Sequence, residues 1–243
     1  MSALPVCGDC LAQMSPLEGI LCSVCGESVP GRHFHGEAGP RCGLCERTAP
    51  PFHQAVAFGA YAGALRDLVH IFKYQQVHSA GPLLGRFVAG ALSRVDLPEN
   101  LLLMPVPLSR EKQSSRGFNQ AEEIARNFLR FSAASGIQLD TAALIRTRET
   151  ASQTGLTRPQ RQSNLRGAFA VKYPERVRGR SVLIVDDVMT TGATASECAQ
   201  VLLRAEASQV FVVTVARAIK NANGEGLLAK TAGAHREGPL GHA

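Results

Sequence analysis

The densest group of chemically useful side chains lies in the stretch "VLIVDDVMTTGATAS", Val182 to Ser196. An apolar run ends in two adjacent acids, Asp186 and Asp187, and a turn rich in threonine and glycine then leads into an expected helix. Neighbouring carboxylates can accept hydrogen bonds from a diol or hold a divalent cation, and the free N–H groups at a helix start bind anions. The pattern predicts a site for a diol beside a phosphate, as in ribose 5-phosphate. The alternative is an ordinary helix cap with two solvated acids.

A second group consists of paired cysteines near the N-terminus. Six of the seven cysteines fall within the first 45 residues as three Cys-x-x-Cys pairs: Cys7 and Cys10, Cys22 and Cys25, Cys42 and Cys45. This spacing suits tetrahedral thiolate zinc, which takes four ligands. The middle pair can join either the first or the last pair. His33 and His35 are further candidates for completing a second site.

The elements that must position these groups follow from the apolar patterning. Strands and helices alternate, and the strands are apolar on both faces, which indicates an α/β domain with a parallel sheet. Strands are expected over 55–61, 101–108, 181–188 and 209–218, and helices over 63–75, 81–95, 119–131 and 191–205. The arginine-rich segment 146–166 shows little periodicity and is expected to be a mobile loop.

Length and composition bound the organisation of the chain. With 243 residues and 45% apolar content, one main domain with a small appendage is expected. We divide the chain into a cysteine module over 1–50, an α/β domain over 51–219 and a disordered tail over 220–243. No apolar run is long enough for a membrane span, and no signal peptide is evident, so a cytoplasmic location is expected.

The positive charge of the chain is concentrated in one segment. The formal net charge is +6, and residues 140–180 contain nine arginines or lysines against three acids. The segment is either a solvated basic loop or a site for phosphates of a small molecule or a nucleic acid. The chain has no tryptophan and only three tyrosines. This composition disfavours an extended groove in which the bases of a single strand stack on aromatic side chains.

The string "VLIVDDVMTTGAT" resembles the phosphoribosyl pyrophosphate (PRPP) signature of type I phosphoribosyltransferases. The resemblance implies that Asp186 and Asp187, as the catalytic acids, contact the ribose hydroxyls. It also implies that the turn binds the 5′-phosphate through the segment Val188, Met189, Thr190, Thr191, Gly192, Ala193 and Thr194.

Two further blocks, "MPVPLSREKQSSRGFNQAEEIA" and "TRETASQTGLTRPQRQSNLRGAF", resemble the ComF branch of that family, proteins of bacterial competence. The resemblance implies a type I phosphoribosyltransferase-like parallel sheet flanked by helices, with a small N-terminal zinc-ribbon module. It favours zinc on Cys22, Cys25, Cys42 and Cys45. It also implies Mg²⁺ with PRPP, and pyrophosphate or loop contacts from Arg110, Lys112, Arg116, Arg146 and Arg161.

Two functions remain open at this point. One is Mg²⁺-dependent phosphoribosyl transfer from PRPP to an unidentified acceptor, linked to competence and DNA uptake. The other is a non-catalytic competence factor that binds PRPP or single-stranded DNA. PRPP or a ribose 5-phosphate-like ligand, single-stranded DNA and other competence proteins are the expected partners, and no residue is identified as a general base.

Overall fold

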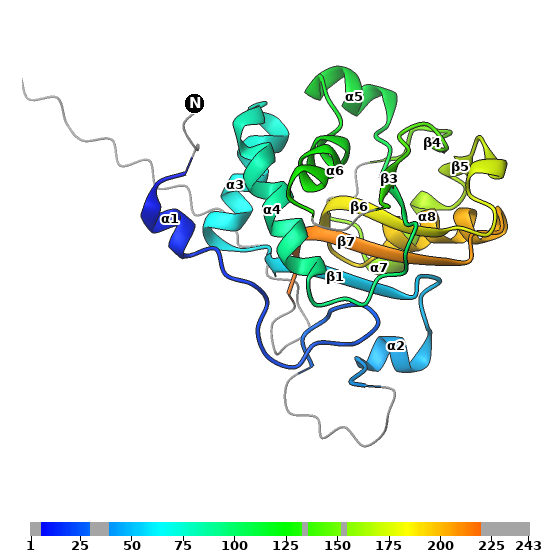
Figure 1. Cartoon of the computed structure of the whole chain (residues 1–243), viewed down its shortest axis with the longest axis horizontal. Helices are drawn as coiled ribbons and strands as arrows, with labels where there is room; N and C mark the ends of the chain where they lie inside the picture. The colour runs from blue at the N-terminus through cyan, green and yellow to red at the C-terminus, as the bar shows by residue number, and fades with distance from the viewer. Residues whose placement is uncertain (1–5, 30–38, 133–135, 152–154, 220–243) are drawn as a thin grey trace, which may run out of the picture.

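The structure is a computed structural model that describes residues 6–29, 39–132, 136–151 and 155–219. Strands and helices alternate along most of the chain (Figure 1). The strands are β1 Gln54–Ala60, β2 Leu102–Pro105, β3 Gln138–Leu139, β4 Leu144–Arg146, β5 Phe169–Val171, β6 Ser181–Met189 and β7 Gln209–Arg217. The α-helices are α1 Gly8–Ala12, α2 Gly43–Arg47, α3 Gly63–Tyr74, α4 Gly81–Leu92, α5 Arg110–Arg116, α6 Gln120–Phe131, α7 Arg158–Leu165 and α8 Ala193–Arg204.

The main sheet has five strands in the order β1-β7-β6-β2-β3, and every neighbouring pair is parallel. The parallel α/β sheet predicted from the alternation of elements is therefore confirmed. Strands β4 and β5 form a separate antiparallel pair beside it. No helix in the described part of the chain is long and apolar enough to cross a membrane.

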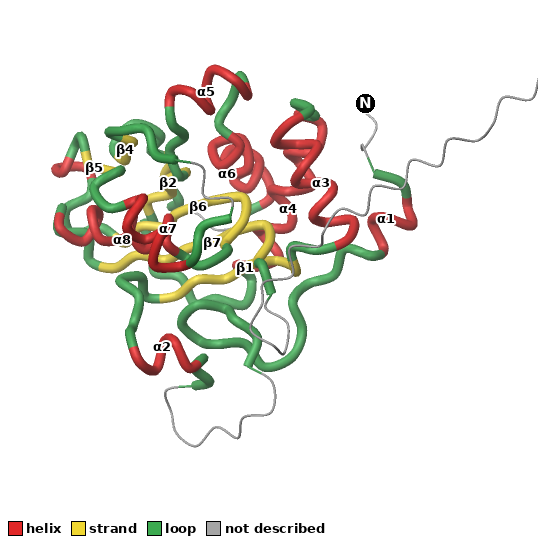
Figure 2. The backbone as a smooth tube through the Cα atoms, turned by 180° about the vertical axis from the view of Figure 1, so that it is seen from behind, coloured by secondary structure: helices red, strands yellow, loops and turns green. Residues whose placement is uncertain are grey.

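Helices cover both faces of the sheet, as Figure 2 shows from behind. Alternate residues of each strand belong to different core clusters because successive side chains of a strand point to opposite faces. Leu183 and Phe211 pack against α3, α4 and α6. Ile184 and Val212 pack in the other cluster, with α8 and the residues around α7 and β5. The buried sheet places the ends of its central strands, β6 and β7, beside the loops that can carry a site.

The cysteine segment shares the core of the α/β sheet. Four cysteines belong to the same cluster of buried residues as Ile184 and Val212. The segment also bonds the free edge of β1, since the Ala55 N–H donates to the carbonyl of Val24 (2.8 Å) and the Leu17 N–H donates to that of Phe58 (2.6 Å). The N-terminal segment is thus built onto the sheet at its β1 edge.

The expectation of a mobile loop over 146–166 is wrong for its second half. Residues 158–165 form α7, because Thr157 and Gln160 make a capping box and Pro159 occupies the first turn, an arrangement that stabilises a helix start. Leu165 anchors the helix in the core. The interpretation missed this helix because its sequence is polar and rich in arginine.

Candidate functional site

The turn after β6 has the geometry of an anion site. Gly192 is the N-cap of α8 and adopts a left-handed conformation with φ +77°, which glycine reaches without strain. A Cβ at this position would lie 2.9 Å from Met189 Cε. The first N–H groups of α8, a twelve-residue helix, have few intrahelical partners and carry the positive end of the helix dipole. The turn Thr190–Thr194, called here the phosphate turn, can therefore bind a phosphate.

The two acids preceding the turn reach different neighbours. Both lie within β6, so their side chains point to opposite faces of the sheet. Asp186 lines a small cavity together with Val106, Thr214 and the phosphate turn. Asp187 pairs with Lys73 of α3, with 2.7 Å between Nζ and Oδ1. The structure therefore brings Asp186 together with the turn and joins Asp187 to a cation from the other face.

Lys73 was not identified from the sequence. Its side chain is 15% exposed, and its pKa is raised: burial opposes the charged form, but Asp187 and Asp186 outweigh it. A signal existed, since Lys73 follows Leu65 and Val69 at intervals of four on the apolar stripe of α3. A lysine on a buried stripe needs a partner, but the sequence does not say that the partner is Asp187.

The pKa of Asp186 is strongly raised. Burial raises the pKa of Asp186 to about 7, and the neighbouring Asp187 contributes, while Lys73, Lys112 and the Asp187 N–H act in the opposite direction. That N–H donates to Asp186 Oδ1 at 2.8 Å. The protonation state of Asp186 therefore changes in the range where most proteins are studied.

Two of the three cations expected to contact pyrophosphate, Lys112 and Arg116, lie near Arg146 of the arginine-rich segment and near Lys73. The pKa of Lys112 is lowered by burial and then by Arg146, Arg116 and Lys73, so the four positive charges share one region. Arg116 also donates to Gln120 Oε1 at 2.8 Å. Arg110, the first residue of α5, is exposed instead.

Arg161 connects α7 with the phosphate turn. Its Nη1 donates to Thr190 Oγ1 at 2.7 Å, and its Nε donates to the Leu156 carbonyl at 3.0 Å. The helix that replaces the expected loop thus places a guanidinium directly on the turn.

Much of the remaining basic segment is engaged within the chain. Arg148, for example, donates to the carbonyls of Asn164 and Arg166. Arg176 and Arg178 pair with Asp140 and Glu206, and Arg180 donates to Gln138. Nucleic-acid binding by this segment stays a prediction, and these contacts give the charge a structural role.

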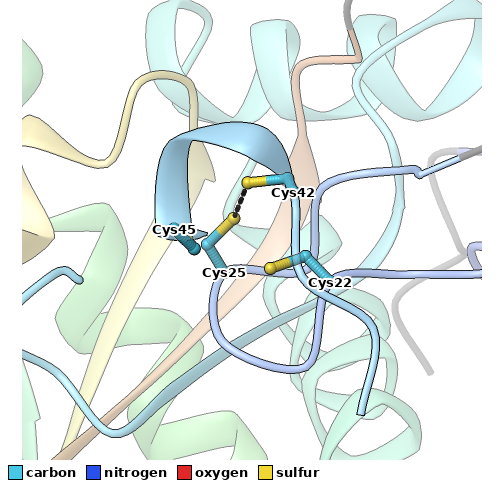
Figure 3. A group of neighbouring side chains, drawn as sticks. All are labelled: Cys22, Cys25, Cys42 and Cys45. Carbon is cyan, nitrogen blue, oxygen red and sulfur yellow. Dashed lines mark hydrogen bonds between the residues drawn. The ribbon is translucent and has the colours of Figure 1, made fainter. Parts of the chain in front are cut away.

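Four cysteines gather into one buried group, shown in Figure 3. Cys22 and Cys25 come from a turn, Cys42 precedes α2, and Cys45 lies within it. Their sulfur atoms all lie within 4.8 Å of one another, and Cys25 and Cys42 Sγ are 3.6 Å apart. Tetrahedral Zn²⁺ with Zn–S bonds of about 2.3 Å requires sulfur separations of about 3.8 Å. The donor set fits a structural zinc.

The pKa values of two of these buried thiols are shifted in opposite directions. N–H groups of Cys42, Cys25 and Val24 overcome the effect of burial and lower the pKa of Cys22 to about 7. Burial raises the pKa of Cys25 to about 12, although the Arg217 guanidinium opposes the rise. Buried thiolates need a compensating cation, which a bound metal supplies.

The other metal candidates lie elsewhere. Cys7 is the N-cap of α1 and exposed, and Cys10 lies within that helix. Neither belongs to the cysteine group found in the described part of the chain. His33 and His35 lie outside the described residues.

A known protein family matches the part of the chain that contains the phosphate turn. A model of the phosphoribosyl transferase domain family matches residues 114–234. The DNA utilization protein YhgH of Escherichia coli K12 is 33% identical over 220 residues, which cover 88% of this chain and 91% of that protein. Competence protein F of Haemophilus influenzae is 28% identical, over 87% of this chain and 96% of that protein. Competence protein ComFC of Bacillus subtilis is 24% identical, over 87% of this chain and 84% of that protein.

Among solved structures, a hypoxanthine phosphoribosyltransferase from Staphylococcus aureus aligns with a TM-score of 0.37 and 11% identity, over 61% of this chain and 67% of that one.

Proposed function

Because this chain belongs to the ComF family of phosphoribosyltransferase-like proteins, we propose that it binds PRPP and transfers the phosphoribosyl group to an acceptor in DNA utilization or competence. The observation that carries the proposal is the cavity that Asp186 shares with the phosphate turn. A carboxylate beside an anion site offers acceptors for the hydroxyls and donors for the 5′-phosphate of one ribose phosphate.

Each part of the site has a role in this proposal. The N–H groups and hydroxyls of the phosphate turn bind the 5′-phosphate, and Arg161 supports the turn through Thr190. The ribose diol lies across the carboxyl end of β6, so that one hydroxyl donates to Asp186 on one face of the sheet and the other donates to Asp187 on the opposite face. Lys112, Arg116 and Arg146 receive the pyrophosphate, since a guanidinium can donate two parallel bonds to a phosphate.

The residues present also fit the two expected metals. Mg²⁺ bound with PRPP would neutralise charge on the departing pyrophosphate, and the carboxylates of Asp186 and Asp187 are oxygen donors of the kind it prefers. Zn²⁺ on Cys22, Cys25, Cys42 and Cys45 would serve the fold. A cation-like ribosyl transition state must also be shielded from water, and α7, held over the turn by Arg161, is positioned to do this.

Calorimetry with PRPP and Mg²⁺ tests the proposal. Thr191→Val keeps the shape of the side chain but removes the hydroxyl, which accepts from the Ala193 N–H at 3.4 Å. We expect PRPP and ribose 5-phosphate to bind about two- to tenfold more weakly, the value of one hydrogen bond. Thr141→Val, at an exposed position outside the site, is the matched control. Absence of PRPP binding by the wild type would refute the proposal. Pyrophosphate release with candidate bases and with single-stranded DNA then identifies the acceptor.

The pKa of Asp186 predicts a pH dependence of PRPP binding. Its carboxylate accepts the ribose hydroxyls only when deprotonated, and with a pKa of about 7 it is mostly protonated at pH 6 and ionised at pH 8. Affinity should therefore rise with pH, by about tenfold between pH 6 and pH 8. The phosphates of PRPP also titrate near pH 6, so Asp186→Asn is the control. An equally steep pH profile in that variant would contradict the assignment to Asp186.

A further inference from the structure

Arg217, the last residue of β7, is a buried cation that the site described above does not use. It is 4% exposed. Its Nη2 lies 2.7 Å from Glu27 Oε2 and 3.7 Å from Cys25 Sγ. Its Nε and Nη1 are buried and have no hydrogen-bond partner among the residues that the structure describes. One carboxylate does not satisfy a guanidinium with five donors, and an unsatisfied buried donor is costly.

Glu27 alone leaves this guanidinium short of partners, and the neighbouring four-cysteine group would supply further negative charge once it holds a metal. Four thiolates around one divalent metal carry a net charge of −2, and the sulfur atoms accept hydrogen bonds. Groups behind the ligands of a metal site orient them and commonly change metal affinity by 10- to 100-fold. The contact to Cys25 places Arg217 in that position relative to the cysteines.

The other side of Arg217 leads to the phosphate turn. In the β6–β7 register Arg217 pairs with Met189, and the next N–H, from Ala218, donates to the Met189 carbonyl at 2.9 Å. Met189 is buried, and its side chain occupies the space that a Cβ on Gly192 would need. The backbone at Arg217 therefore holds Met189 in place, and Met189 packs against Gly192 of the phosphate turn.

A single cavity of about 320 Å³ spans the same two sites. Its lining includes Cys25 and Cys45 from the cysteine group, Arg217, and Thr191 and Gly192 from the phosphate turn. The metal group and the turn thus face one cavity, which Arg217 also lines.

We propose that Arg217 couples the metal-loaded cysteine group to the phosphate turn, so that zinc and PRPP bind cooperatively. The guanidinium compensates the charge of the metal–thiolate group and thereby holds the end of β7 against Met189. A shift at the cysteines changes the packing under the turn, and a ligand on the turn stabilises the metal group in return, because coupling between two binding sites is reciprocal. The PRPP half of this inference rests on the proposed function.

Equilibrium competition with a chromophoric zinc chelator, on the full chain with and without PRPP and Mg²⁺, tests the coupling. In the wild type, PRPP should raise zinc affinity at least about fivefold, the lower end of typical allosteric coupling. Arg217→Gln should lower zinc affinity at least about tenfold and abolish the effect of PRPP. Arg217→Lys keeps the positive charge but loses the forked donors of the guanidinium. Its zinc affinity and its response to PRPP should lie between those of the wild type and of Arg217→Gln. Arg204→Gln, at the exposed end of α8, is the control and should resemble the wild type.

The outcomes separate the two halves of the inference. Wild-type zinc affinity in Arg217→Gln would overturn the role of Arg217 at the metal group, whether or not PRPP binds. Loss of zinc affinity with the PRPP effect retained would overturn the coupling. If calorimetry shows no PRPP binding by the wild type, the proposed function and the coupling fail together, and the chelator assay without PRPP still decides the metal role. Should Arg217→Gln not fold, wild-type zinc affinity and coupling in Arg217→Lys would overturn the assignment to the guanidinium.

Discussion

Replacing Cys25 by serine is expected to destabilise the α/β sheet as well as the N-terminal segment. Cys25 is 6% exposed and belongs to the same buried cluster as residues of β6, β7 and α8. Zinc bound by four cysteines contributes on the order of 10 kcal/mol to the folding of small zinc domains. Even a loss of roughly 5 kcal/mol would lower the melting temperature of a domain of this size by about 10–20 °C.

Thermal unfolding of the zinc-loaded protein, followed by circular dichroism, measures this effect. Cys7→Ser is the matched control, because Cys7 is exposed and lies outside the cysteine group. We expect its melting temperature to stay within a few degrees of the wild type. Equal melting temperatures for Cys25→Ser and Cys7→Ser, or metal analysis showing no zinc in the wild type, would rule out the structural metal.

Replacing Asp187 by asparagine is expected to lower both PRPP affinity and stability. Charge-assisted hydrogen bonds contribute about 1.5–3 kcal/mol against about 1 kcal/mol for neutral ones, so affinity should fall by roughly tenfold. The change also removes the carboxylate that lies 2.7 Å from Lys73 Nζ. The Lys73 side chain is only 15% exposed, so its charge is then buried without a partner. Breaking a buried ion pair from one side costs about 3–5 kcal/mol.

A double variant separates these two losses. Lys73→Met together with Asp187→Asn removes the unpaired buried charge, so much of the stability should return, while PRPP affinity should remain low. Calorimetry and thermal unfolding of the wild type, both single variants and the double variant give the complete cycle. Recovery of PRPP affinity along with stability would mean that Asp187 serves the fold through Lys73 and does not contact the ribose.

The parts of the fold that were predictable have strong local signals. The apolar run before Asp186 and the stripe of Leu65, Val69 and Phe72 on α3 show strand and helix without reference to the rest of the chain. The capping box of Thr157 and Gln160 was also readable, but the arginines around it favoured the interpretation as a loop. Chain order gave the parallel sheet, since helices between strands force parallel connections.

The parts that were not predictable depend on contacts between distant segments. Lys73 and Asp187 are 114 positions apart, and Arg217 and Cys25 are separated by 192. No local pattern specifies which buried cation meets which anion. The boundary near residue 50 rests on composition and stays a prediction. Composition does not show that the cysteines fill the same core as the sheet.

The hydrogen bonds from Ala55 to Val24 and from Leu17 to Phe58 have a consequence for the behaviour of the protein in concentrated solution. Strand β1 is a seven-residue edge strand, and an uncovered edge is a template on which another chain can add a strand. The N-terminal segment occupies that edge at two points. Detaching it, by chelation or by deletion, would expose a row of unpaired backbone groups on an apolar strand. Protein treated in either way should then form intermolecular sheet and aggregate, and after chelation, adding zinc back before aggregation should prevent it.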